Sequence, residues 1–400
     1  MPLGWIDFSK TDRNKALSIL ELISDPGTLD ELGIAPVRDG FANIFFPGTS
    51  TIQTRAKYFL IVPYAFLDLE NSHETNPDRM LKVFDEIEKK SAELLLEKAD
   101  DAEGVIGRVA ISHNRWVKRT PADIYWSGLR SFGIFTYGNL SISECIKIIC
   151  DYNEKKAYLS RLGNSNDKPG EWEKDDRDAG GIIKPHLWNV STYKSDWKDK
   201  LCISLSQEES FFLKERIISS YPDSMLGIIL RKKLPFVFQC DGFEAIQNQI
   251  VHFPKQIKDD YNLALDFSHF IYVIRVLYNI LVSAGRNEEA MLEWEDLEKK
   301  IDQYASVDLD SIFSRLGISS NYALCRFLNK AKELMSKHDE EGMKNEIQRR
   351  EKELKQSRAK TVNPGKYDPN TWYGGKYLDY RFENAKQIVR DIFDGEEDLC

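Results

Sequence analysis

Helical spacing of apolar residues runs through the second half of the chain almost without a break, and this pattern constrains the fold most. Ser206 and Glu209 open it as a capping box, since a serine followed three residues later by glutamate is typical of a helix start. The spacing predicts helices near 207–220, 223–233, 243–252, 256–285, 288–304, 308–315, 319–337 and 339–358. Strand-like alternation over 201–205 predicts one short edge strand. We therefore expect a mainly α, multi-helix globule with at most a small β element.

The first half of the chain also predicts helices, but turns interrupt them more often. Helices are expected over 11–24, 51–69, 77–99, 121–133 and 141–161. Residues 28–47 are expected to be rich in turns, and Pro63 should kink or end its helix. A polar stretch with several Gly and Pro residues is typical of a connection between domains. The expected organisation is an N-terminal helical domain over 1–162, a connecting segment over 163–200 and a C-terminal helical domain over 201–400.

Composition limits the classes of function. The 400-residue chain has a net charge of −9, which argues against a protein that coats nucleic acid non-specifically but leaves room for a local basic patch. Its most apolar stretch, 263–284, contains Asp266, His269 and Arg275, so we expect a buried helix and no membrane span. No signal peptide is evident at the start, and the six scattered cysteines suit a reducing cytoplasm. No metal-ligand spacing is present, so neither a metal nor a cofactor is expected.

The first candidate site is the loop from Pro47 to Tyr58, which is predicted to enter a helix. A helix N-terminus offers free N–H groups and a positive dipole end, and both suit phosphate. The residues assigned to nucleic-acid binding here are Thr49, Ser50, Thr51, Gln53, Arg55 and Lys57. The alternative is that a hydroxyl only caps the helix while the two cations lie in solvent. The Gly-Lys-Ser/Thr ending of a P-loop is missing.

The second candidate site runs from Gly104 to Phe135. Five cationic side chains stand against one aspartate there, in a chain that is acidic overall. Interleaved aromatic residues suit a nucleic-acid backbone with an unstacked base. The residues assigned to binding are Arg108, Lys118, Arg119, Tyr125 and Trp126. The alternative places Trp126 in the core and the arginines on a solvated face.

Carboxylates near these tracts are candidates for catalysis. Cleavage of an N-glycosidic bond builds positive charge on the sugar, which a carboxylate can stabilise. We assign Asp39 and Asp101 this role, although acidic residues are also common as helix caps. Near the end of the chain, Arg381 is a further candidate for contact with a phosphate backbone. No Ser-His-Asp set or zinc-deaminase signature is evident.

At these residues the sequence resembles an uncharacterised bacterial family found in phage-defence loci. The motifs that carry the resemblance are Gly4–Ser9, Phe46–Ala56, Gly104–Arg108, Tyr125–Leu129 and Leu378–Arg381. The resemblance implies a DNA glycosylase that flips glucosylated hydroxymethylcytosine out of phage DNA and leaves abasic sites. Its implied partners are phage DNA and other proteins of the defence locus.

A local likeness to helix-hairpin-helix glycosylases accompanies this resemblance. Ser50–Thr54 looks like the start of their glutamine-threonine helix, and Leu129–Gly133 like a hairpin turn. The chain departs from that pattern because it lacks a Gly-x-Gly hairpin and an aspartate at the usual distance, so no catalytic residue is carried over. Two other hypotheses stay open. One is a non-catalytic DNA-binding or sensor subunit, and the other is a helical adaptor that uses the 339–360 helix.

Overall fold

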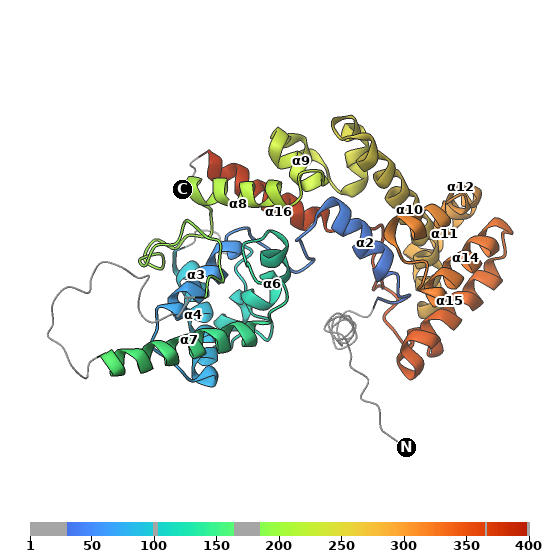
Figure 1. The fold of residues 1–400 in the computed structure, drawn as a ribbon. Coiled ribbons are helices and arrows are strands. Elements are labelled where there is room, and N and C mark those ends of the chain that lie inside the picture. Colours follow the sequence, from blue (N-terminus) through green and yellow to red (C-terminus); the bar gives the residue numbers. More distant parts are fainter. Residues whose placement is uncertain (1–29, 99–102, 164–184, 365, 398–400) are drawn as a thin grey trace, which may run out of the picture. The chain divides into compact units, whose positions relative to one another are not determined.

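The computed structural model describes residues 30–98, 103–163, 185–364 and 366–397 (Figure 1). These residues form α-helices and short 3-10 helices, and no strand occurs among them, which confirms the mainly α prediction. Their one β element is an isolated antiparallel bridge between Phe135 and Trp188. The prediction of a strand over 201–205 is wrong, because these residues pair with no strand in the described part of the chain.

The chain divides into two compact units that interleave in sequence. Unit 1 comprises Met1–Phe41 and Lys258–Leu378, and unit 2 comprises Ala42–Ile257 and Asp379–Cys400. Of the connection predicted over 163–200, residues 185–200 belong to unit 2, and residues 164–184 lie outside the described residues. Unit 2 takes up the end of the chain because its last helix packs there, and sequence order gives no sign of that pairing.

Unit 2 contains most of the predicted site. Its helices are α3 (Tyr58–Glu70), α4 (Pro77–Lys98), α5 (Arg108–Ser112), α6 (Pro121–Ser131), α7 (Ile142–Gly163), α8 (Gln207–Ser220), α9 (Met225–Lys232) and α16 (Phe382–Glu396). Two 3-10 helices, η1 (Pro235–Gln239) and η2 (Phe243–His252), follow α9, so the α-helix predicted over 243–252 is a 3-10 helix.

Helix α3 forms the centre of unit 2. All its residues except Leu67 and Asp68 are buried, and it packs against α4, α6 and α7. Burial of one large apolar side chain contributes about 1.5–3 kcal/mol, so this helix anchors the unit. Pro63 lies inside α3 and does not end it.

Helices α8 and α16 lie side by side in unit 2, although they come from distant parts of the chain (Figure 1). Ile388, Val389 and Ile392 of α16 are buried. At Gly395 a Cβ atom would lie 2.1 Å from Oγ of Ser210, so only glycine lets the two helices approach this closely.

Unit 1 is built around the long helix α10 (Lys255–Ser283). Its other helices are α2 (Ala35–Phe45), α11 (Glu288–Glu298), α12 (Ile301–Ala305), α13 (Leu309–Leu316), α14 (Tyr322–Ser336) and α15 (Glu340–Lys355), with the 3-10 helices η3 (Gln356–Arg358) and η4 (Lys360–Val362). Helices α2 and α10 each cross a boundary between the units.

Helix α10 is long and apolar enough to cross a membrane by length and composition, but 78% of its most apolar window is buried inside the protein. The predicted buried helix is therefore confirmed. Arg275, the cation within it, donates a 2.6 Å hydrogen bond to the carbonyl oxygen of Lys376.

Helix α2 replaces the turn-rich passage expected over 28–47. Pro36 suits a first helical turn, and Val37 and Phe41 are buried.

Candidate nucleic-acid interface

A surface groove in unit 2 is formed by one continuous stretch of chain, Val105–Val117, which we call the groove segment. The groove has a volume of about 530 Å³. Two arginines, a histidine and a tryptophan are among the side chains that line it: Arg108, Arg115, His113 and Trp116. Cations beside an aromatic ring suit nucleic acid, because the cations meet phosphates and the ring meets a base.

Left-handed backbone positions give the groove segment its shape. Gly107 has φ 89°, and a Cβ atom there would lie 2.8 Å from Cζ3 of Trp116. Both the dihedral angle and the close approach require glycine. Asn114, with φ 54°, then turns the chain back after α5. The ring of Trp116 is thereby packed against the backbone at Gly107.

The indole of Trp116 carries an unmet hydrogen-bond donor. The side chain is only partly buried, but its Nε1 atom is buried and has no acceptor among the residues that the structure describes. Buried donors are nearly always paired, so such a group needs a partner.

The cations of the groove segment are available to solvent. Arg108 and Arg115 are exposed, and neither forms an ion pair with any residue in the described part of the chain. Lys118 and Arg119 follow directly after the segment and are exposed as well. Positive charge therefore remains accessible along this stretch, as binding to phosphate requires.

The loop from Pro47 to Tyr58, which we call the 47–58 loop, packs directly against the start of the groove segment. Oγ1 of Thr54 donates a 2.6 Å hydrogen bond to the carbonyl oxygen of Gly104. The backbone N–H of Ile106 donates to the hydroxyl of Tyr58 at 2.8 Å. The two stretches singled out from the sequence therefore meet in the fold.

The 47–58 loop does not present a helix N-terminus to a ligand. Helix α3 begins at Tyr58, and the backbone N–H groups of Tyr58 and Phe59 are buried in its first turn and donate to the carbonyl oxygens of Arg55 and Ala56. Oγ1 of Thr49 donates to the carbonyl oxygen of Phe46, and Nε2 of Gln53 donates to that of Gly48. The assignment of these two polar side chains to nucleic acid is thus corrected: they satisfy carbonyl groups of their own loop.

Two further hydroxyl residues of this loop have different surroundings. The backbone N–H of Ser50 donates to Oε1 of Gln53 at 3.1 Å, while its Oγ atom is buried and has no partner among the described residues. Thr51 is exposed. Of the six residues assigned in the loop, Thr51 is therefore the one whose side chain faces solvent most openly.

Arg55 and Lys57 form internal ion pairs. Nε of Arg55 lies 3.0 Å from both carboxylate oxygens of Asp391, and the Ala56 N–H donates to the same carboxylate at 2.7 Å. Nζ of Lys57 lies 2.6 Å from Oε2 of Glu209. Their assignment to nucleic acid is corrected, because each cation is held by a buried acid.

Asp391 is a structural residue that sequence analysis missed. Burial raises the pKa of its carboxyl, and the Arg55 guanidinium opposes that rise. The aspartate lies on α16, 336 residues from its arginine partner. No local signal in the sequence marks a contact over that distance.

Tyr125 and Trp126 belong to the core of unit 2. The Tyr125 hydroxyl accepts from the backbone N–H groups of Thr54 and Arg55 and lies 2.8 Å from the Arg55 carbonyl oxygen, to which it donates. Burial raises the pKa of this hydroxyl. Nε1 of Trp126 donates to the carbonyl oxygen of Leu140. Neither ring offers a face to a base, so their predicted stacking role is corrected and the core alternative holds.

The remaining assigned residues are dispersed. Asp39 lies in unit 1, where Nε of Arg38 is 3.1 Å from its carboxylate, and Asp101 is outside the described residues. In unit 2, Arg381 donates at 2.8 Å to Oδ1 of Asn43 and to the carbonyl oxygen of Thr49. Arg381 therefore stabilises the 47–58 loop by a hydrogen bond to its backbone.

The described residues contain no group of three or more His, Cys, Asp or Glu that could hold a metal ion.

Comparison with known protein families matches residues 1–151 to a family of unknown function (DUF6361). The matched residues include both the 47–58 loop and the groove segment. No curated protein and no solved structure matches the chain.

Proposed function

We propose that the protein binds nucleic acid through the groove segment. The observation that carries the proposal is the presence of Arg108 and Arg115 in one groove, exposed and outside any ion pair within the described residues. Guanidinium groups hold phosphate oxygens by paired, charge-assisted hydrogen bonds. The partly buried ring of Trp116 lines the same groove beside these cations.

The test is fluorescence anisotropy with a short labelled DNA, as a duplex and as a single strand. The variant Arg108→Gln/Arg115→Gln should weaken binding about tenfold or more, since it removes two phosphate contacts. Lys147→Gln/Lys155→Gln on α7 removes the same charge from two exposed sites of unit 2 and serves as the control. Equal weakening by both variants would mean that general charge, not the groove, attracts DNA.

Excision of a modified cytosine, implied by the resemblance, is a further step and stays a prediction. It would depend on Asp39 or Asp101, the carboxylates assigned from the sequence. The same protein can be incubated with DNA containing glucosylated hydroxymethylcytosine and the abasic sites counted. Abasic sites that disappear in an Asp39→Asn/Asp101→Asn variant would support excision. Binding without abasic sites would favour a DNA-binding or sensor subunit.

A further inference from the structure

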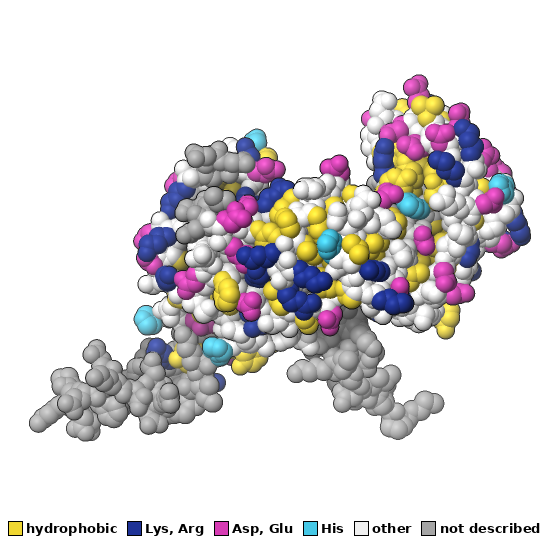
Figure 2. Space-filling model, turned by 90° about the horizontal axis from the view of Figure 1, so that it is seen from above, with side chains coloured by type: hydrophobic (Ala, Val, Ile, Leu, Met, Phe, Trp, Pro, Cys, Tyr) yellow, Lys and Arg dark blue, Asp and Glu magenta, His cyan; other side chains and the backbone are white. Residues whose placement is uncertain are grey.

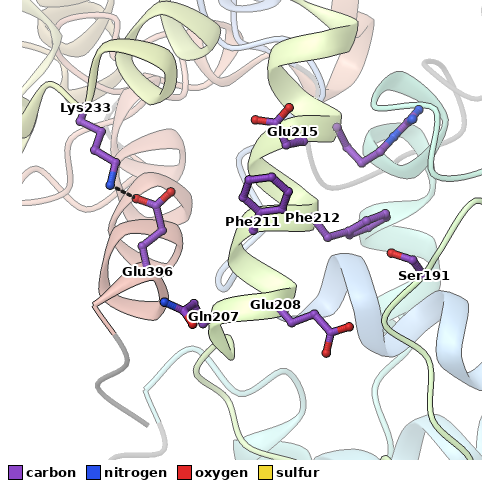
Figure 3. A pocket seen from close by; sticks show the side chains of 9 residues that line it. Ser191, Gln207, Glu208, Phe211, Phe212, Glu215, Lys233 and Glu396 are labelled. Carbon is purple, nitrogen blue, oxygen red and sulfur yellow. Dashed lines mark ion pairs between the residues drawn. The ribbon is translucent and has the colours of Figure 1, made fainter.

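A second surface groove in unit 2 lies along α8, and we call it the α8 groove. Its volume is about 620 Å³. The side chains that matter for its chemistry are Glu208, Phe211, Glu215, Arg216, Lys233 and Glu396. Figure 3 shows Phe211 in the middle of the helix, with Glu208 and Glu215 one turn away on either side.

Phe211 is exposed, and the packing of unit 2 does not use its side chain. The side chain is 63% exposed, whereas Leu213 and Ile217 on the same helix are fully buried. These buried residues anchor α8, so the fold does not depend on Phe211. Covering a phenylalanine ring removes apolar surface from water and so stabilises a complex. On the face seen in Figure 2, hydrophobic side chains reach the surface among charged ones.

The cations around this groove are already engaged. Lys214 and Lys233 lie 2.5 Å and 2.7 Å from the carboxylate of Glu396. The guanidinium of Arg216 donates to the carbonyl oxygens of Phe132 and Gly133. Glu215, in contrast, is exposed and has no cationic partner within the described residues. The uncommitted charge beside the exposed ring is therefore negative.

We propose that the α8 groove binds a peptide segment of a partner protein that carries an aliphatic side chain next to a lysine or arginine. The aliphatic group covers the Phe211 ring, and the cation pairs with Glu215. A cation close to the ring face gains further attraction from its quadrupole. Phosphate is disfavoured here because the uncompensated carboxylate of Glu215 repels it. The site is separate from the groove segment and goes beyond the proposed function.

The test uses a labelled, amidated helical peptide of leucine, alanine and lysine, with a leucine, alanine and glutamate peptide as its charge-reversed partner. Anisotropy is measured on the full chain at physiological salt. Phe211→Ala and Glu215→Gln should each weaken binding of the lysine peptide about fivefold or more. Tyr158→Ala and Glu154→Gln are matched controls, since they alter an aromatic ring of similar exposure (62%) and a carboxylate four residues from it on α7. These controls should change binding less than twofold.

Three outcomes overturn the proposal. The first is a lysine peptide that binds no better than its charge-reversed partner. The second is equal weakening by the α8 and α7 variants, which indicates attraction by overall negative charge. The third is a dimer in sedimentation velocity that Phe211→Ala abolishes, since the occupant is then a second copy of the chain. Circular dichroism and urea unfolding of Phe211→Ala establish that the variant is folded.

Discussion

The 47–58 loop and the groove segment are both rich in polar and basic residues, but the fold uses them in opposite ways. In the loop, Arg55 and Lys57 are paired with buried carboxylates. In the groove segment, Arg108 and Arg115 remain in solvent without such partners among the described residues. A basic residue in the sequence therefore indicates a ligand site only where the rest of the chain supplies no acid for it.

The largest effect is expected at the acid that holds Lys57. Glu209 accepts from Lys57 Nζ at 2.6 Å, from Tyr64 OH at 3.3 Å and from the Ser206 N–H at 2.8 Å. Glu209→Ala should lower the free energy of unfolding by about 4 kcal/mol, because it leaves a buried ammonium unpaired. Urea denaturation measures the change.

The neighbouring residue provides the control for that prediction. Glu208 forms an exposed ion pair with Lys194 at 3.2 Å. Its replacement by alanine should cost less than about 1 kcal/mol. Similar losses of unfolding free energy for both substitutions would show that the buried ion pair of Lys57 with Glu209 contributes no more than an exposed one.

A somewhat smaller effect is expected at the acid that holds Arg55. Asp391→Ala removes the acceptor for the Arg55 guanidinium and the Ala56 N–H. We expect a loss of about 3 kcal/mol in chemical denaturation. Asp394→Ala changes an exposed carboxylate on the same helix and should be nearly neutral. A neutral Asp391→Ala would contradict the account of the loop as an internal structure.

Glu88 differs from Glu209 and Asp391, because it is a buried acid that has no cationic partner among the described residues. Its Oε1 accepts from the Ala122 N–H at 2.7 Å, and its Oε2 has no partner among the described residues. Burial raises the pKa of Glu88 from 4.5 to about 8. Over that range the unfolded chain releases the proton while the folded chain retains it, so stability should fall as the pH rises.

The loss from Glu88 should be at most about 1.4 kcal/mol per pH unit. Glu88→Gln should remove this part of the pH dependence, whereas Glu86→Gln, at an exposed position on the same helix, should preserve it. Urea midpoints at several pH values between acid and mildly alkaline conditions distinguish the two variants. Parallel pH profiles for wild type and Glu88→Gln would refute the assignment.

The smallest change in stability is expected in the groove segment. Gly107→Ala places a side chain at φ 89° against Trp116 and should cost about 1–2 kcal/mol. We expect DNA affinity to fall with it, since the ring and α5 must move. Gly138→Ala, where a Cβ atom meets nothing within 4 Å, should affect neither property. Unchanged DNA affinity in a folded Gly107→Ala variant would show that Trp116 does not contribute to DNA binding.

Local chemistry allowed much of the fold to be predicted from the sequence. The capping box at Ser206 and Glu209 starts α8 at Gln207, and Pro121 starts α6. Predictions failed where tertiary contacts override local signals. Helix α3 continues through Pro63 because its neighbours bury most of its side chains, and α2 forms where turns were expected.

The candidate site was predictable only in part, for the same reason. The sequence predicted the basic stretch that contains Arg108 as a candidate site, and it also predicted the 47–58 loop, which packs beside that stretch. It could not show that Asp391 reaches Arg55 or that Tyr125 holds the loop's backbone, since these contacts join residues 336 and about 70 apart. Trp116 is one of the aromatic residues that the sequence places among the basic ones, and the turn at Gly107 positions its ring in the groove.

The salt dependence of DNA binding tests the contrast between the two regions most directly. Each phosphate contact contributes about 0.9 to the slope of log affinity against log salt concentration for duplex DNA. Arg108→Gln/Arg115→Gln should lower that slope by about two, while folded Arg55→Gln should leave it unchanged. An unchanged slope in the double variant, or a reduced slope in Arg55→Gln, would contradict the claim that the groove segment is the one that meets DNA.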